Sequence, residues 1–263
     1  LKIGKRQRIN PVLAQSAIVR GANPELLVKA YSLEEARESA RCGADTVFYN
    51  IFATDFPVAE KWGEKASLGA FLPRIMDEAE LGRAIELLSD RRPGSVLTGN
   101  LGFLAHRGNF KLPVYGDYSL NVFNDLDILF YKRFKVRPVL SPELSLGELA
   151  DFRNRDAAIL IHGDIVLVNT RICPETTRLA DEKGLVFPVR QEDGYWQILN
   201  SRPFGVFNDI RRLRALGFSH FLIDREGEGP SLAALYRRML NEDVPDRRLR
   251  KRTTSGHLYR PVG

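Results

Sequence analysis

The sequence predicts an α/β fold, a (βα)8 TIM-like barrel with an extended β-rich insertion between strands 7 and 8. Eight short apolar runs alternate with helical segments, the pattern of a parallel sheet covered by helices. The first seven runs start about 17 to 27 residues apart, which is close to one strand–helix unit each. The gap before the eighth run, roughly 60 residues, breaks this rhythm. An open doubly wound sheet is the alternative, but the first run is not followed by a Gly-rich phosphate-binding motif.

The strands are expected where β-branched and aromatic residues cluster between turn residues. They cover residues 26–30, 46–50, 68–72, 95–98, 112–115, 137–140, 158–161 and 219–223. The first helix has clear boundaries, because Ser32 is an N-cap, Glu35 takes the capping-box position and Gly43 ends it. Further helices are predicted over residues 77–88, 125–134, 145–152, 208–216 and 231–240.

The long gap contains a second β-rich element. Phe187–Arg190 and Tyr195–Leu199 flank an Asp193-Gly194 pair, a strong signal for a hairpin. Pro188 suits an edge strand, because proline has no N–H for a neighbouring strand. Residues 163–205 therefore form the predicted insertion over the barrel mouth, within a single domain that spans residues 1–263.

Composition indicates a soluble protein. No apolar run approaches the roughly 20 residues that cross a bilayer, so no membrane partner is expected. The 263 residues include two cysteines, Cys42 and Cys173, which cannot form a disulfide framework and indicate a reducing, cytoplasmic location. The chain begins with Leu1 rather than Met, which predicts the C-terminal part of a longer protein.

The net charge of +6 comes from the two ends, while the body of the chain is mildly acidic. The basic tail, residues 245–263, includes the run Arg247–Arg252. Such a run binds nucleic acid through its phosphates, or is a solvated tail that contacts another domain. The second interpretation is favoured.

The carboxyl ends of the predicted strands carry polar and charged side chains. In a TIM barrel these ends surround the active-site mouth, so residues far apart in sequence meet there. The ring comprises Lys29, Tyr49, Asn50, Arg74, Asn100, Asp117, Glu143, His162, Asp224 and Arg225. Charged groups that converge over an apolar floor are typical of catalytic and binding sites.

Asp117 and Glu143 form a candidate pair for acid–base catalysis, with nearby cations deciding which carboxyl stays ionised. Equally, Glu143 caps the following helix or pairs with Arg74. The sequence has neither a Gly-x-Ser-x-Gly nor a His-Glu-x-x-His motif. Ser119 and Ser141 lie near these carboxylates, but the sequence places no histidine beside them as a base.

His162 and Cys173 are candidate metal ligands, since they lie about ten residues apart where the seventh strand leads into the insertion. A zinc ion requires four ligands, and a two-fold homodimer would supply two histidines and two cysteines. The alternative is a hydrogen-bonded rim histidine and a cysteine packed as a small apolar residue.

Several segments resemble the collagenase-like peptidases, peptidase family U thirty-two. The similarity extends over nearly the whole chain, through Gly43–Asp45, Leu72–Arg74, Gly99–Gly102, Asp117–Asn124, Leu140–Ser145, His162-Gly163, Arg171–Cys173, Asn200–Arg202 and Gly256–Val262. It implies a (βα)8 barrel. Its Asp117–Asn124 block adds Tyr118, Asn121 and Asn124 to the predicted ligand-binding residues, which are otherwise Lys29, Arg74, Asn100, Asp224 and Arg225.

The resemblance implies a peptidase that binds a peptide or small acidic ligand at the mouth, with Asp117, Glu143 and His162 as catalytic residues. Relatives that hydroxylate RNA bases or quinones use four cysteines to hold an iron–sulfur cluster. This chain has one cysteine in that segment, Cys173, so no such cluster is expected. RNA or quinone modification, and a non-catalytic peptide-binding barrel with a structural metal, remain the alternatives.

Overall fold

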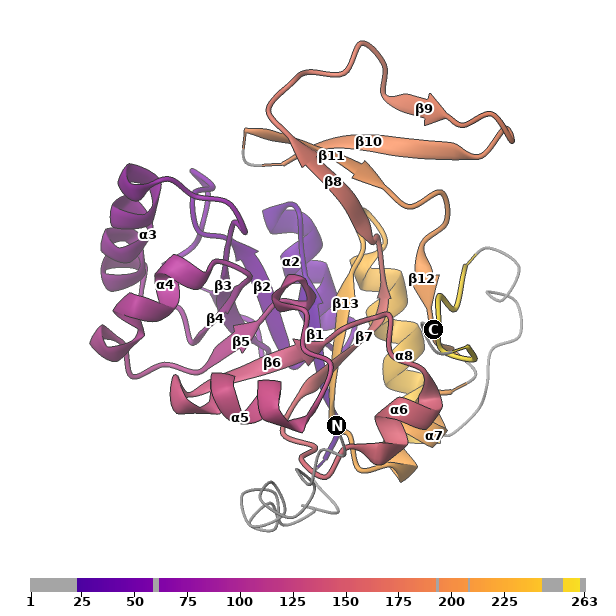
Figure 1. The fold of residues 1–263 in the computed structure, drawn as a ribbon. Coiled ribbons are helices and arrows are strands. Elements are labelled where there is room, and N and C mark those ends of the chain that lie inside the picture. The colour runs from indigo at the N-terminus through magenta and orange to yellow at the C-terminus, as the bar shows by residue number, and fades with distance from the viewer. Residues whose placement is uncertain (1–22, 59–61, 193, 208, 243–252, 261–263) are drawn as a thin grey trace, which may run out of the picture.

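Eight parallel strands close into a barrel in the computed structural model, which describes residues 23–58, 62–192, 194–207, 209–242 and 253–260 (Figure 1). The barrel strands are β1 (Glu25–Lys29), β2 (Thr46–Asn50), β3 (Ser67–Leu72), β4 (Ser95–Thr98), β5 (Val114–Gly116), β6 (Val136–Leu140), β7 (Ala158–Gly163) and β13 (His220–Asp224). Each pairs with the next, and β13 pairs with both β7 and β1, which completes the ring. The predicted barrel is therefore confirmed.

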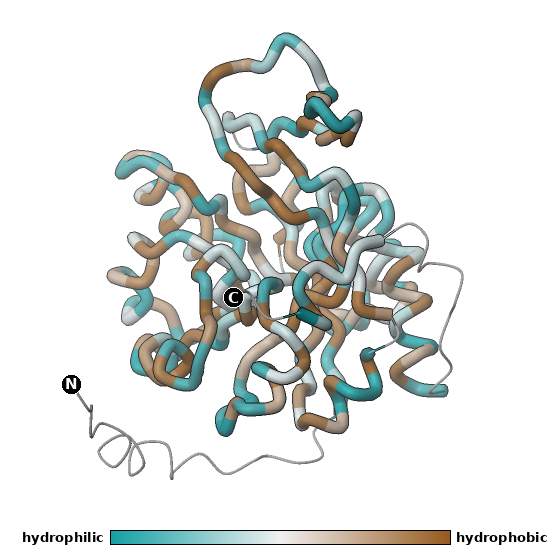
Figure 2. The backbone as a smooth tube through the Cα atoms, turned by 45° about the vertical axis from the view of Figure 1, so that its right-hand side comes forward, coloured by the Kyte–Doolittle hydropathy of each residue, from teal (hydrophilic) through white to brown (hydrophobic). Residues whose placement is uncertain are grey.

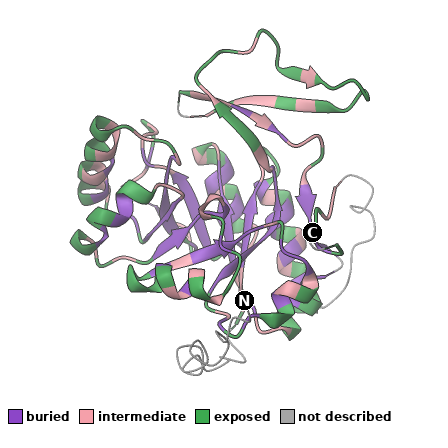
Figure 3. Cartoon of the chain, viewed as in Figure 1, coloured by how far each residue is buried: buried purple, intermediate pink, exposed green. Residues whose placement is uncertain are grey.

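The helices cover the outside of the barrel, so each strand is buried on both faces (Figure 3). They are α2 (Leu33–Arg41), α3 (Glu78–Arg91), α4 (Leu101–His106), α5 (Asp125–Arg133), α6 (Leu146–Asp151), α7 (Ile210–Ala215) and α8 (Gly229–Glu242). The expected N-cap at Ser32 is present, since its side chain accepts a hydrogen bond from the Glu35 backbone N–H. Asp77 and Ser145 form complete capping boxes that begin α3 and α6.

Polar side chains close the amino-terminal end of the barrel. The Glu25 carboxylate accepts a hydrogen bond from the Tyr115 hydroxyl at 3.2 Å and lies 3.2 Å from Nε2 of His220. The Tyr115 ring packs edge-on against Phe48 in the barrel interior. His220 is thus part of a partly buried polar cluster at the amino-terminal end of the barrel, on the side away from the mouth.

The insertion is a four-stranded antiparallel sheet that stands over the mouth (Figure 1). Its order is β8 (Val166–Thr170), β11 (Tyr195–Leu199), β10 (Val186–Glu192) and β9 (Arg178–Ala180). The predicted hairpin is the β10–β11 pair, and Gly194 in its turn has the positive φ of 76° that glycine tolerates. A short strand, β12 (Phe204–Gly205), returns the chain to β7. The insertion carries both apolar and polar stretches (Figure 2), and in β8 the apolar run Val166–Val168 precedes the polar Asn169 and Thr170.

Two predictions concern residues outside the described ranges. The basic run Arg247–Arg252 lies there, as does the start of the predicted helix at Asn208. Among the helices that are described, none is long and apolar enough to cross a bilayer.

Candidate functional site

A buried network of charges fills one half of the barrel mouth, and Lys29 lies at its centre. Its side chain is only 4% exposed. The ammonium nitrogen is 2.6 Å from Oε1 of Glu192 and 3.8 Å from Oδ1 of Asp224, and it lies 3.8 Å from the centre of the Phe71 ring. Since Glu192 belongs to β10, this ion pair joins the barrel to the insertion.

Arg190 extends the network from the same strand. Its guanidinium donates to Oε1 of Gln197 at 2.8 Å and lies 3.8 Å from Oδ2 of Asp164. Asp164, at the end of β7, also accepts a short hydrogen bond from Arg225. Tyr31 donates to Oδ1 of Asp224 at 2.5 Å. Cations and carboxylates therefore alternate across the mouth, and the buried charges are paired, as burial requires.

The pKa shifts show how strongly these groups depend on one another. Burial lowers the pKa of Lys29, but Asp224 and Glu192 outweigh burial and raise it above its ordinary value. Burial raises the pKa of Asp224, but Lys29 and Arg190 reverse that effect and hold it below its ordinary value. Both groups are therefore charged at neutral pH. We infer that this half of the mouth holds the insertion in place.

The other half of the mouth is open and forms a cleft of about 350 Å³. The carboxyl ends of β3 to β6 form its floor, and the start of the insertion forms one wall. The lining residues are Arg74, Gly99, Tyr118, Ser119, Asn121, Ser141, Pro142, Glu143, Ile165, Val166 and Asn169. Most of its side chains are polar, and Arg74 supplies a positive charge.

Asp117 fixes the position of Arg74 at the edge of this cleft. Nε of Arg74 donates to Oδ2 of Asp117 at 2.5 Å, and the two side chains are 14% and 3% exposed. Ser119 donates to the same carboxylate oxygen at 3.3 Å. Oδ1 of Asp117 is buried without a hydrogen-bond partner among the described residues. Burial lowers the pKa of Arg74, but Asp117 and Tyr118 raise it well above its ordinary value, so Arg74 remains a cation.

Tyr118 connects the barrel floor to the insertion. Its ring packs against the guanidinium of Arg74, 4.3 Å from the ring centre. Its hydroxyl donates to the carbonyl oxygen of Asp164 and accepts from the backbone N–H of Val166, both at 3.2 Å. The start of β8 is thereby held against the cleft.

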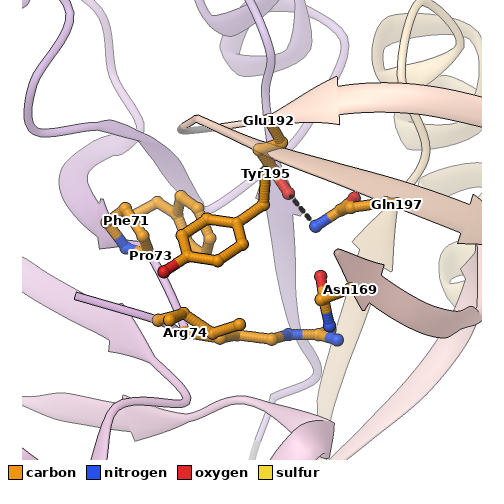
Figure 4. A pocket seen from close by; sticks show the side chains of 8 residues that line it. Phe71, Pro73, Arg74, Asn169, Glu192, Tyr195 and Gln197 are labelled. Carbon is orange, nitrogen blue, oxygen red and sulfur yellow. Dashed lines mark hydrogen bonds between the residues drawn. The ribbon is translucent and has the colours of Figure 1, made fainter. Parts of the chain in front are cut away.

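A second, narrow cavity continues from the cleft beneath the insertion. Its volume of about 20 Å³ is enough for a water molecule. Arg74 and Asn169 line both spaces, and Figure 4 shows the Arg74 side chain extending towards Asn169 while the Tyr195 ring lies alongside. The remaining lining residues are Phe71, Pro73, Ile75, Glu192 and Gln197.

The predicted residues divide into three groups. Arg74, Tyr118, Asn121 and Glu143 line the cleft, with Asn121 and Glu143 exposed, and Asp117 lies beneath it. Lys29, Asp224 and Arg225 belong to the charge network. Asn100 and Asn124 instead cap helices, because their side chains accept from the backbone N–H groups of Phe103 and Asp127.

His162 lies outside the barrel wall and not in the mouth. Its ring packs edge-on against Phe207 at 5.0 Å and Tyr236 at 6.2 Å, beneath α8, and the residue is 2% exposed. The cause is a bulge in β7: Leu160 pairs with Leu222, but His162 pairs with Ile223, which leaves Ile161 as an extra residue. Simple alternation would place His162 on the inner face with Leu160, and the extra residue turns it outwards.

Cys173 lies in different surroundings from the buried His162, because it is exposed in the β8–β9 loop of the insertion. Burial lowers the pKa of His162 to about 4, assisted by the charge of Arg225, so its imidazole is neutral at physiological pH. Within the described ranges, no group of three or more His, Cys, Asp or Glu side chains is arranged to hold a metal. The structure does not bring the two predicted zinc ligands together.

Four residues of the site lie on the insertion and were not predicted from the sequence. Arg190, Glu192 and Gln197 reach the mouth from β10 and β11, and Asn169 reaches it from β8. Arg190 and Glu192 are two residues apart on one strand, so they face the same side. Their spacing could have indicated two charged side chains on one face of the hairpin. The sequence alone does not show which face of the hairpin lies against the barrel.

The comparisons with known proteins yield a distant structural match. No family model and no curated protein match the sequence. Among solved structures, the chain is similar to an archaeal RuBisCO, ribulose 1,5-bisphosphate carboxylase/oxygenase, with 16% sequence identity and a TM-score of 0.44. The alignment covers 89% of this chain and 62% of that one.

Proposed function

We propose that the protein is a peptidase that binds an acidic peptide in the open cleft at the barrel mouth. The observation that carries this proposal is Arg74, a cation fixed by Asp117 at the edge of a polar cleft of about 350 Å³. Nε of Arg74 is engaged by Asp117, so a peptide carboxylate would meet the terminal nitrogens of the guanidinium. Two such nitrogens bind a carboxylate with fixed geometry, which favours arginine over lysine at this position.

Glu143 is the proposed general base. It is exposed in the cleft, whereas Asp117 is buried and paired with Arg74. In the proposed reaction, Glu143 takes a proton from water, and the water oxygen attacks the peptide carbonyl carbon. The carbon–nitrogen bond then breaks, and Glu143 returns the proton to the leaving amine. Ser141 and Asn121 are close enough in the cleft to orient the peptide.

His162 and a shared zinc ion have no part in this proposal. His162 is buried beneath α8 between aromatic rings, and an ion bound to it would have to displace that packing. The proposed location is the cytoplasm, on the basis of the two unpaired cysteines in the sequence.

A digest of casein labelled with fluorescein tests binding and cleavage together. We expect the wild-type chain to bind these acidic peptides and to release smaller fragments, with or without a chelator. Glu143→Gln should retain binding and lose cleavage. Glu175→Gln, which changes an exposed carboxylate in the insertion, is the matched control and should behave as wild type. Binding without cleavage in the wild type would favour a non-catalytic peptide-binding barrel, and no binding would refute the proposal.

A further inference from the structure

The insertion presents a free strand edge to the cleft. In the sheet order β8-β11-β10-β9, the strand β8 has a neighbour on one side, and no described strand pairs with its other side. An unpaired edge offers backbone N–H and C=O groups to another extended chain. Ile165, Val166 and Asn169, at the start of β8 and within it, line the open cleft.

The hydrogen bonds at the start of β8 show which way this edge faces. The carbonyl oxygen of Ile165 accepts from the backbone N–H of Asn200, on the β11 side. The carbonyl oxygen of Asp164 and the N–H of Val166 point the opposite way, to the Tyr118 hydroxyl on the cleft floor. The free edge therefore faces the cleft, and at its first position a side-chain hydroxyl replaces the neighbouring strand.

We propose that the peptide ligand binds as an added fifth strand along the free edge of β8. Its backbone pairs with β8, and its side chains alternate between the cleft and the outer surface. The side chains on the cleft side meet Arg74 and Asn169, which accounts for selection of an acidic residue. Two exposed apolar residues, Leu167 (51% exposed) and Val168 (46% exposed), lie beside the outward side chains of the peptide. The ligand class is thus an unfolded acidic segment in extended conformation.

This inference rests on the proposed peptide binding, and it adds the mode of recognition. The proposed function requires only that a peptide occupies the cleft. Strand addition further requires that alternate backbone N–H groups of that peptide form hydrogen bonds with β8.

An N-methyl scan of the tightest-binding casein peptide tests the strand geometry. We expect a period of two: methylation at alternate residues weakens binding by about fivefold or more, as expected for a lost hydrogen bond. Methylation at the residues between them should leave affinity unchanged. Uniform effects, or none, would overturn strand addition while the proposed binding stands. No binding of any casein peptide would refute both.

A photo-crosslinking peptide identifies the edge that is used, because β9 forms the other end of the sheet. With a benzophenone group at its centre, the peptide should label residues 141–143 or 165–170. Labelling confined to residues 178–180 of β9 would contradict the assignment to β8.

Discussion

The ammonium group of Lys29 lies 2.6 Å from the Glu192 carboxylate, and this contact joins residues 163 positions apart in the sequence. Lys29 ends the first barrel strand, and Glu192 ends a strand of the insertion. Because both are largely buried, the pair contributes to holding the insertion on the barrel and so defines one side of the open cleft.

Replacing Lys29 should destabilise the fold strongly. Lys29→Met leaves Glu192 and Asp224 without their shared cation in a buried site, so we expect a loss of about 3–5 kcal/mol in the free energy of unfolding. Urea denaturation measures this loss. Lys183→Met, at an exposed position in the insertion, is the control. Equal stability of the two variants would show that the buried charge network contributes nothing to the free energy of unfolding.

The buried His162 should make the protein sensitive to acid. Its pKa is about 4 in the folded chain, against an ordinary value near 6.5. The unfolded state therefore binds the proton more readily, and stability that is complete above pH 6.5 is lost as the pH falls towards 4. The loss should reach about 3 kcal/mol. His162→Phe retains an aromatic ring and should flatten this dependence, whereas His106→Gln, at an exposed residue, should not. A slope that is the same in His162→Phe and wild type would contradict the assignment.

Tyr118 should hold the insertion against the barrel. Tyr118→Phe retains the ring beside Arg74 but loses the two hydrogen bonds to the start of β8. We expect a loss of about 1 kcal/mol and faster trypsin cleavage in the insertion at Arg171 and Arg178. Tyr131→Phe is the matched control, because its hydroxyl bonds to Leu120 within the barrel. Equal cleavage rates in the two variants would show that Tyr118 does not anchor the insertion.

Gly99 should be required for the shape of the cleft. A Cβ atom at this position would collide with Oγ of Ser119 and approach Arg74 at 3.1 Å. Gly99→Ala should therefore turn the Ser119 hydroxyl away from Asp117, destabilise the protein by about 1 kcal/mol and weaken peptide binding. Gly82 lies in α3 with open space around its Cβ position, so Gly82→Ala should be neutral or stabilising by about 0.4–1 kcal/mol. Thermal unfolding compares the two, and an unaffected Gly99→Ala would refute the tight packing.

The barrel was predictable because it depends on local signals. Apolar runs, helix caps such as Ser32 and the turn at Gly194 each depend on a few neighbouring residues, and the spacing of the strands follows from them. The sequence also places Arg74 and Asp117 at the same barrel mouth, but it offers Glu143 as a partner for Arg74, and in the structure that partner is Asp117.

The rest of the site could not be predicted, because it depends on contacts between residues far apart in the sequence. His162 faces the helices because of one extra residue in β7, and a bulge leaves no clear mark in an apolar run. Arg190 and Glu192 enter the mouth because the hairpin folds back over it, which is a long-range arrangement. Asn100 follows a strand, as site residues do, and Asn124 was added through the Asp117–Asn124 block, but each stands just before a helix and caps it.

The most direct test of peptide binding in the mouth cleft compares a residue of β8 with an exposed residue of the insertion outside that strand. Asn169 lines the cleft, while Leu185 is 46% exposed between β9 and β10. We expect Asn169→Trp to fill the cleft and weaken the binding of labelled casein peptides by about tenfold or more, equivalent to about 1.4 kcal/mol. Leu185→Trp should bind as wild type does. Equal affinities of the two variants, measured by fluorescence anisotropy, would contradict a peptide site in the cleft.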